Sequence, residues 1–148
     1  MKKLLTFICI IMFTVMFCDA QSYIRKGSSR YGEVMYNWDG KNLRSGRSQY
    51  GDVLINFDGR QIRSGRSAYS TPLYTWDGEE MHSGSSKYGK VICNSDGINV
   101  RGGSSKYGEV LFNVRGNKIR SGSSAYGTVL YNIDGTIPIP ILIYLLLL

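Results

Sequence analysis

Residues 43–61 read LRSGRSQYGDVLINFDGRQ, and this 19-residue pattern returns along most of the chain. Each unit joins an apolar residue and Arg-Ser-Gly to Tyr-Gly, then to a Val-Leu pair and an Asn-x-Asp-Gly sequence. Six units without gaps begin at Ile24, Leu43, Ile62, Met81, Val100 and Ile119. A repeat this regular leaves no room for a linker or a second domain between Ile24 and Gly135.

Each unit has the pattern of a β-hairpin. Residues 34–37 are β-prone, residues 37–40 (Asn-Trp-Asp-Gly) form a turn, residues 42–45 return, and residues 46–51 link to the next unit. Asn favours the first position of a type I turn, and Gly favours a position that needs a left-handed backbone. The first turn position is therefore assigned to Asn37, Asn56, Thr75, Asn94, Asn113 and Asn132.

The turn length decides which side chains share a face, and two registers are open. A three-residue loop sets Met35 and its equivalents, which are always aliphatic, opposite the openers such as Leu43. A two-residue Asp-Gly loop sets the mixed series of Tyr36 and Ile55 opposite the same openers. We favour the first register, which predicts a core of aliphatic pairs.

The units predict an all-β fold of six hairpins. One hairpin cannot bury its own apolar face, so the units must pack on one another, either as a closed ring or as an open solenoid. We favour the flower-like or propeller-like ring because closure removes exposed strand edges. Essentially no helix is expected after Gln21.

The N-terminus has the features of a secretory signal. Lys2 and Lys3 precede an apolar run, and small residues near Ala20 predict cleavage there. The three predicted regions are a signal peptide at 1–20, the repeat domain at 21–136 and an apolar tail at 137–148. Cleavage leaves a net charge of +6 and Cys93 as the sole cysteine, which excludes a disulfide within the mature chain. We expect a secreted or cell-envelope protein.

The tail carries Pro138 and Pro140 and then eight apolar residues, 141–148. The two prolines permit an edge strand but not a central one, and eight residues are too few for a helix to cross a bilayer. Burial inside or under the ring is the favoured prediction. Contact with a membrane or a partner is the alternative.

These features together resemble the secreted bacterial β-flower proteins. The resemblance rests on the Lys-Lys signal, on tandem units such as residues 119–127 followed by residues 129–135, and on the apolar tail. It implies short hairpins fanned around a pseudo-symmetry axis and it implies export, but it brings no catalytic residues. The five-fold members have five shorter units, whereas this chain has six units of 19 residues.

Turn-tip aromatics are the first candidate for a binding site. Trp38, Phe57 and Trp76 occupy a turn position that does not require an apolar side chain, and exposed rings stack well on sugars and peptides. Packing of each ring on its neighbouring hairpin is the alternative. The arginines Arg25, Arg44 and Arg63 are the accessory candidates, either for sulfated or phosphorylated glycans or, more simply, as partners of nearby carboxylates.

Other recurring residues are interpreted as structural. The tyrosine found in every unit is taken as a packing element: Tyr31, Tyr50, Tyr69, Tyr88, Tyr107 and Tyr126. The Asp of Asp-Gly is given a turn role rather than a calcium-binding one. No metal site and no cofactor are expected, and interleaved acidic residues argue against nucleic acid.

Catalysis has little support in the sequence. The mature chain has one histidine, His82, and one cysteine, Cys93, eleven residues apart. Glu79 and Glu80 would point to opposite faces of a strand. The sequence therefore predicts a non-enzymatic structural or interaction module with an unknown protein or glycan partner. The alternative function is glycan binding through the turn-tip aromatics.

Overall fold

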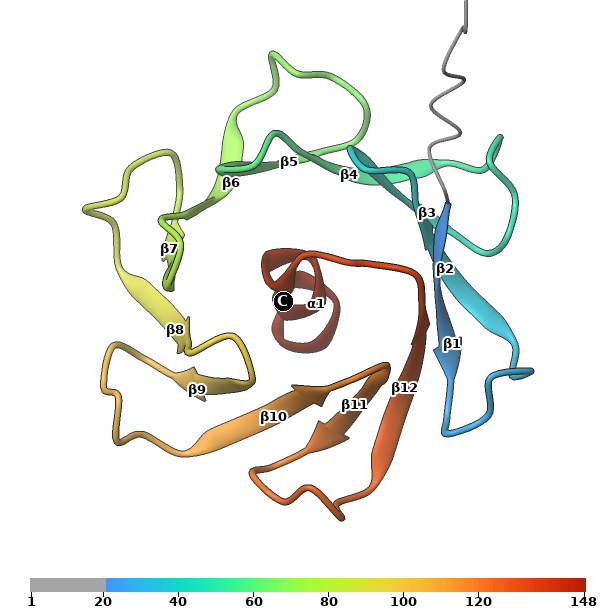
Figure 1. The fold of residues 1–148 in the computed structure, drawn as a ribbon. Coiled ribbons are helices and arrows are strands. Elements are labelled where there is room, and N and C mark those ends of the chain that lie inside the picture. The colour runs from blue at the N-terminus through green and yellow to red at the C-terminus, as the bar shows by residue number, and fades with distance from the viewer. Residues whose placement is uncertain (1–20) are drawn as a thin grey trace, which may run out of the picture.

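The computed structural model describes residues 21–148, so the predicted signal peptide at 1–20 lies outside the described residues. Twelve antiparallel strands form six hairpins that close into a ring (Figure 1). The strands are β1 Ser22–Lys26, β2 Val34–Trp38, β3 Asn42–Ser45, β4 Val53–Phe57, β5 Gln61–Ser64, β6 Pro72–Trp76, β7 Glu80–Ser83, β8 Val91–Ser95, β9 Asn99–Gly102, β10 Val110–Arg115, β11 Lys118–Ser121 and β12 Val129–Asp134. The closed ring confirms the predicted architecture over the open solenoid.

The two ends of the repeat region make the sixth hairpin. Strand β12 has no following strand to pair with, and β1 fills that place, with Ile24 opposite Ile133. The same register joins Leu43 to Trp38 in the first consecutive hairpin. Ring closure therefore uses the pairing found inside every hairpin, and no strand edge is left open.

The predicted hairpin register was wrong. The openers pair with the turn-position residues, as Leu43 does with Trp38, rather than with the aliphatic series of Met35. Trp38 is the last residue of β2, and the connection consists of residues 39–41, with Gly40 at a φ of +94°. Residues at the Trp38 position therefore lie at the end of the first strand of each hairpin and not in its turn.

The aliphatic series faces outward. Between β3 and β4, Leu43 pairs with Ile55 and Arg44 with Val53, so a bulge leaves Leu54 as the extra residue. Its equivalents Leu73 and Leu111 are 40% and 38% exposed. The bulge repeats between all hairpins, so none of these residues is among the buried core residues that sequence reasoning predicted. Ile92 alone of the series still packs against the core from a partly buried position.

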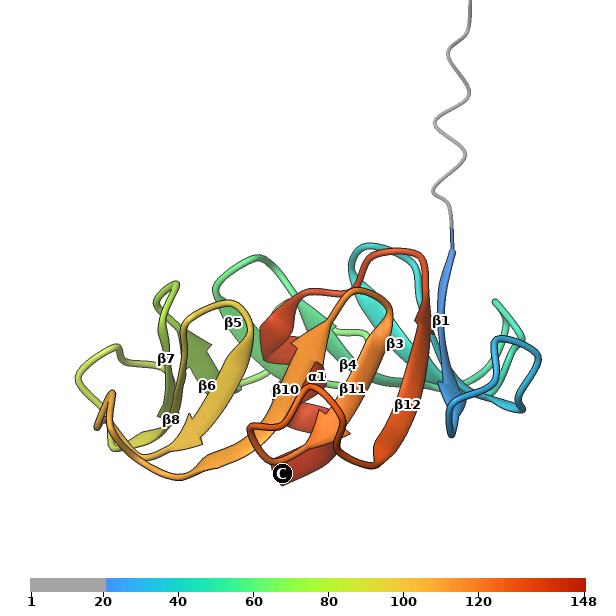
Figure 2. The same ribbon diagram turned by 60° about the horizontal axis from the view of Figure 1, so that its bottom comes forward.

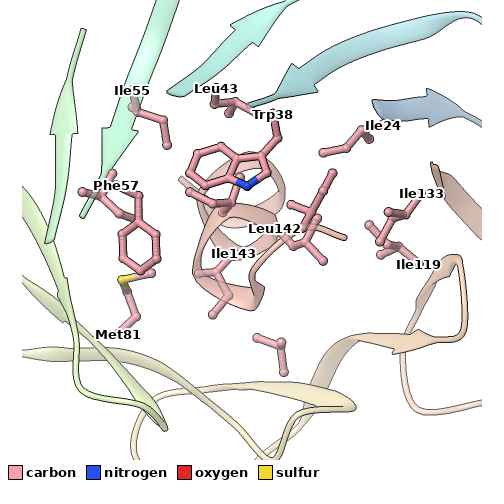
Figure 3. Close-up of a cluster of buried hydrophobic side chains, with 14 of the residues drawn as sticks. Ile24, Trp38, Leu43, Ile55, Phe57, Met81, Ile119, Ile133, Leu142 and Ile143 are labelled. Carbon is pink, nitrogen blue, oxygen red and sulfur yellow. The ribbon is translucent and has the colours of Figure 1, made fainter. Parts of the chain in front are cut away.

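The core fills the centre of the ring. Inward side chains come from the openers, from the series of Ile55 and from the series of Trp38, and they surround a central helix (Figure 3). All six openers are at most 1% exposed: Ile24, Leu43, Ile62, Met81, Val100 and Ile119. This layering is the main apolar burial in the molecule, so it supplies most of the drive for folding.

The tail forms that central helix, α1 Ile139–Leu147, and this corrects the expectation of no helix after Gln21. It runs through the ring from one face to the other (Figure 2). A closed ring offers the tail no strand edge, so its backbone groups must bond among themselves, which a helix achieves. Ile141, Leu142 and Ile143 are buried, as the burial prediction required.

The two prolines begin the helix. Pro138 is the N-cap and Pro140 lies in the first turn, where a missing N–H costs nothing. Before them, Thr136 N donates to Ser22 Oγ at 2.9 Å, which fixes the tail's exit against β1. No helix among residues 21–148 is long and apolar enough to cross a membrane.

The sequence suggested that the repeated asparagines start a turn, but in the structure they do not. Asn56 is buried, and its Nδ2 donates to Gly65 O at 2.8 Å and to Ser67 O at 3.1 Å. The same pair of bonds recurs at the equivalent positions Asn37, Asn94 and Asn113. Each amide therefore clamps the loop that connects its hairpin to the next.

Candidate functional site

The turn-tip aromatics lie inside the ring rather than on its surface. Trp38 is 4% exposed and Phe57 is 7% exposed, and both face the helix (Figure 3). Trp76 is partly buried and packs on the same core. The exposed tips that the binding-site candidate needs are therefore absent from the described structure, because these residues occupy inward-facing strand positions. They pack within the protein, as the alternative held, although on the central core.

The candidate arginines are engaged with the turn carboxylates. Arg44 Nη1 lies 2.5 Å from Asp39 Oδ2, and Arg63 Nη1 lies 2.6 Å from Asp58 Oδ2. The third candidate, Arg25, reaches Asp134 at 3.2 Å. Pairing with a carboxylate is thus confirmed, although the partner is the turn Asp. Neutralised and largely buried, these arginines do not form an open anion site.

The turn Asp organises the hairpin tip. Asp39 Oδ1 accepts from the backbone N–H groups of Lys41 and Asn42, at 2.9 and 2.6 Å. Burial opposes ionisation of this carboxyl, but those N–H groups and Arg44 outweigh it and lower its pKa to about 2. The predicted turn role of the Asp series is confirmed.

Among residues 21–148 the loop tyrosines are the exposed aromatic side chains, which corrects their interpretation as packing elements. Each lies in a loop that connects one hairpin to the next, and these loops project at the periphery of the ring (Figure 1). Their exposed fractions are Tyr31 82%, Tyr50 87%, Tyr69 99%, Tyr88 86%, Tyr107 100% and Tyr126 98%. We call this set the tyrosine ring.

The loops that carry the tyrosine ring are fixed by hydrogen bonds. Tyr50 N donates to Ser48 Oγ at 3.1 Å, and the Ser48 carbonyl accepts from the buried Asn37 amide. Gly51 lies so close to Ser45 O that a Cβ there would be 3.1 Å from it. Each Tyr-Gly sequence therefore holds a tight loop that presents its aromatic ring to solvent.

Cys93 and His82 do not form a nucleophile and base. The Cys93 thiol is fully buried in the core, and burial raises its pKa to about 11. His82 is next to the inward-facing Met81, so its side chain faces the other side of the sheet. The two side chains thus lie on opposite faces.

His82 takes the place of the arginine in the third hairpin. Its Nε2 is 2.9 Å from Asp77 Oδ2 and 3.8 Å from Glu80 Oε2. The hydrogen bond to Asp77 raises the His82 pKa, burial opposes this, and the contact with Gly89 O adds to the rise. Beside this cluster a hollow of about 880 Å³ includes Trp76, Asp77 and Glu80 in its lining.

A comparison with protein families matches residues 24–142 to one described as the 6-fold beta flower protein. The chain belongs to the 6-fold beta flower protein family. The match spans all six hairpins and the start of the helix, so the beta flower fold includes the ring seen here. No curated protein and no solved structure matches the chain.

Sequence reasoning missed two features of this beta flower. The first is the exposure of the tyrosine ring, because repetition in every unit shows only that each unit needs the residue. The second is the cluster of Asp77, Glu80 and His82, which becomes visible only with the true register. Its sequence signals were that His82 stands where the other units have Arg, and that Glu80 is an acid at a position held elsewhere by Asn, Gln, Lys or Tyr.

Proposed function

We propose that this beta flower is an exported, non-enzymatic interaction module of the cell envelope or the extracellular space. Its binding surface is the tyrosine ring. The observation that carries this proposal is the exposure of all six loop tyrosines, from 82% to 100%. Export is the expectation from residues 1–20, and Cys93 and His82 on opposite faces support a non-enzymatic role.

An exposed tyrosine contributes little to folding, because it buries almost no surface in its own chain. In a complex, the phenol group of such a tyrosine adds a large contact area at a small cost in side-chain entropy. The anchoring of Tyr50 N to Ser48 Oγ reduces that cost further, because the loop is already ordered before contact.

Six equivalent loops suit a partner that itself repeats. A single tyrosine contact is weak, but several contacts made at once multiply in affinity. Arg30 and Lys87 lie over the rings of Tyr31 and Tyr88 at 5.1 and 5.2 Å, which places positive charge beside two of the aromatic groups. We infer a polymeric protein or glycan of the envelope as the partner class.

Glycan binding is the second candidate, now with different residues. Trp38 and Phe57 are buried and cannot stack on a sugar, whereas the exposed tyrosines can. A glycan array therefore separates the two classes of partner. Strong array binding would favour a sugar, and binding to envelope protein without array signal would favour a polypeptide.

The test compares binding of three variants to isolated envelope material and to the array. Replacing all six loop tyrosines with serine should abolish binding, and replacing Tyr31, Tyr69 and Tyr107 alone should weaken it far more than twofold. The control replaces the exposed tip residues Lys41, Arg60 and Asn117 with serine and should bind normally. Normal binding by the six-serine variant would refute the proposal.

A further inference from the structure

The third hairpin breaks the charge pattern of its neighbours. The other hairpins with a turn Asp place an arginine against it and carry no second acid at the equivalent site, as with Asp39, Asn42 and Arg44. The third hairpin has Asp77, Glu80 and His82 there. It has lost the permanent cation and gained a carboxylate, so two acids share one imidazole.

His82 reaches the same two acceptors as an arginine of the series. Arg25 donates from Nη1 to Gly32 O at 3.0 Å and from Nη2 to Asp134. His82 places Nδ1 3.2 Å from Gly89 O and Nε2 2.9 Å from Asp77 Oδ2. A protonated imidazole would donate to both acceptors. A neutral imidazole that donates through Nδ1 points its Nε2 lone pair at the Asp77 carboxylate, and a metal ion bound there would satisfy both groups.

We propose that Asp77, Glu80 and His82 bind one divalent transition-metal ion of the Zn²⁺ type. One imidazole nitrogen and two carboxylate oxygens are suitable ligands for such ions. The three ligand atoms all lie within 4.8 Å of one another. Ligand atoms about 2.1 Å from a shared ion are roughly 3.0–3.4 Å from one another. His82 Nε2 lies 2.9 Å from Asp77 Oδ2 and 3.8 Å from Glu80 Oε2, and these two distances bracket that range.

The surroundings of the cluster orient the ligands. Asp77 Oδ1 accepts from the backbone N–H groups of Glu79 and Glu80 at 2.9 and 2.7 Å, so Oδ2 turns toward His82. Gly89 O fixes the imidazole through Nδ1, as outer-shell carbonyls do for metal-bound histidines. The His82 side chain is 5% exposed, whereas those of Asp77 and Glu80 are 31% and 29% exposed. Solvent can therefore supply the remaining ligands.

The repeat supplies matched variants. His82→Arg restores the residue found at Arg44, Arg63 and Arg101, and Glu80→Asn restores the residue found at Asn42 and Asn99. Both variants should fold, because each installs a side chain that the equivalent hairpins already accommodate. A transplant, Asn42→Glu with Arg44→His, rebuilds the cluster in the first hairpin beside Asp39.

The experiment titrates the full chain with Zn²⁺ by calorimetry and with Co²⁺ by visible absorption. The wild type should show one saturable Zn²⁺ site and cobalt d–d bands. Loss of an outer-shell partner costs a metal site about 10–100-fold in affinity, so loss of the proposed ligand in Glu80→Asn should weaken Zn²⁺ binding at least about 10-fold. His82→Arg should weaken it at least as much. The transplant should bind a second equivalent.

Two results would overturn the proposal. One is a wild-type chain that binds no stoichiometric Zn²⁺. The other is unchanged Zn²⁺ affinity in either the His82→Arg or the Glu80→Asn variant, which would assign any uptake to other residues. Circular dichroism establishes that each variant is folded. Binding of envelope material is measured separately, so failure of the metal site leaves the test of the tyrosine ring intact.

Discussion

Ile24 and Ile133 lie opposite each other across β1 and β12, although they come from the two ends of the repeat region. Their pairing repeats the register of Leu43 with Trp38 inside a single hairpin. The ring therefore depends on one hairpin that forms only when the whole chain has folded around the helix, which makes folding a global event.

Deletion of one complete unit, residues 62–80, should abolish cooperative folding. Five hairpins would have to close around a helix that six enclose, and β12 would no longer meet β1 in register. An open array of repeats would instead lose stability in proportion to the removed unit. Chemical denaturation followed by tryptophan fluorescence and far-UV circular dichroism distinguishes these outcomes, and a folded five-unit protein with proportionate stability would contradict closure.

The helix should be essential to the ring. Leu142→Ala should cost about 2–5 kcal/mol of unfolding free energy, because Leu142 is 1% exposed in the lumen. Leu148→Ala is the matched control at the exposed end of the same segment, where the residue is 46% exposed, and it should change stability by less than about 0.5 kcal/mol. Equal effects of the two variants in urea denaturation would argue against a buried plug.

The asparagine clamp can be tested with the chain's own exception. Thr75 replaces Asn in the third unit and keeps one bond, from Oγ1 to Gly84 O at 2.7 Å. Asn56→Thr should therefore be milder than Asn56→Val, which removes both bonds of the buried amide at similar volume. The valine variant should lose about 1–3 kcal/mol. Urea midpoints that rank the two variants in the opposite order would refute the clamp.

The contribution of Asp39 to the stability of the fold should decrease at acid pH. The folded pKa of Asp39 is lowered to about 2 from its ordinary value of 3.8, so its ionised form stabilises the fold above pH 3.8. That contribution is lost as pH falls from 3.8 toward 2. The stability difference between wild type and Asp39→Asn should thus shrink over this window, as measured by urea denaturation. A difference that stays constant would contradict the assignment.

The repeat made the fold class predictable, but the register depended on whether Trp38 ended a strand or began a turn. The Asn-x-Asp-Gly sequence suits both cases, and only packing around the helix decides between them. The helix itself was hidden because Pro138 and Pro140 suggested an edge strand. A closed ring leaves no edge to join, so the same prolines begin a helix instead.

The candidate site was less predictable than the fold for a related reason. Trp38 looked like an exposed tip because the predicted register placed it in the turn. Tyr50 looked like a packing residue because it recurs, yet its loop is held by Ser48 and Asn37 while its ring stays in water. The bulges between hairpins and the hydrogen bonds of the buried asparagines decide which side chains face outward. The repeat pattern does not reveal these features directly.

Chemical modification of tyrosines tests the central claim most directly, because it reads the exposure of each ring in the folded protein. Nitration followed by peptide mass spectrometry should modify Tyr31, Tyr50, Tyr69, Tyr88, Tyr107 and Tyr126 rapidly. The inward-facing Tyr36, Tyr74 and Tyr131 and the helix residue Tyr144 should react slowly, because they pack against the core. Similar nitration rates in the two groups, or protection of the six loop tyrosines, would contradict the claim that the protein presents these six side chains to a partner.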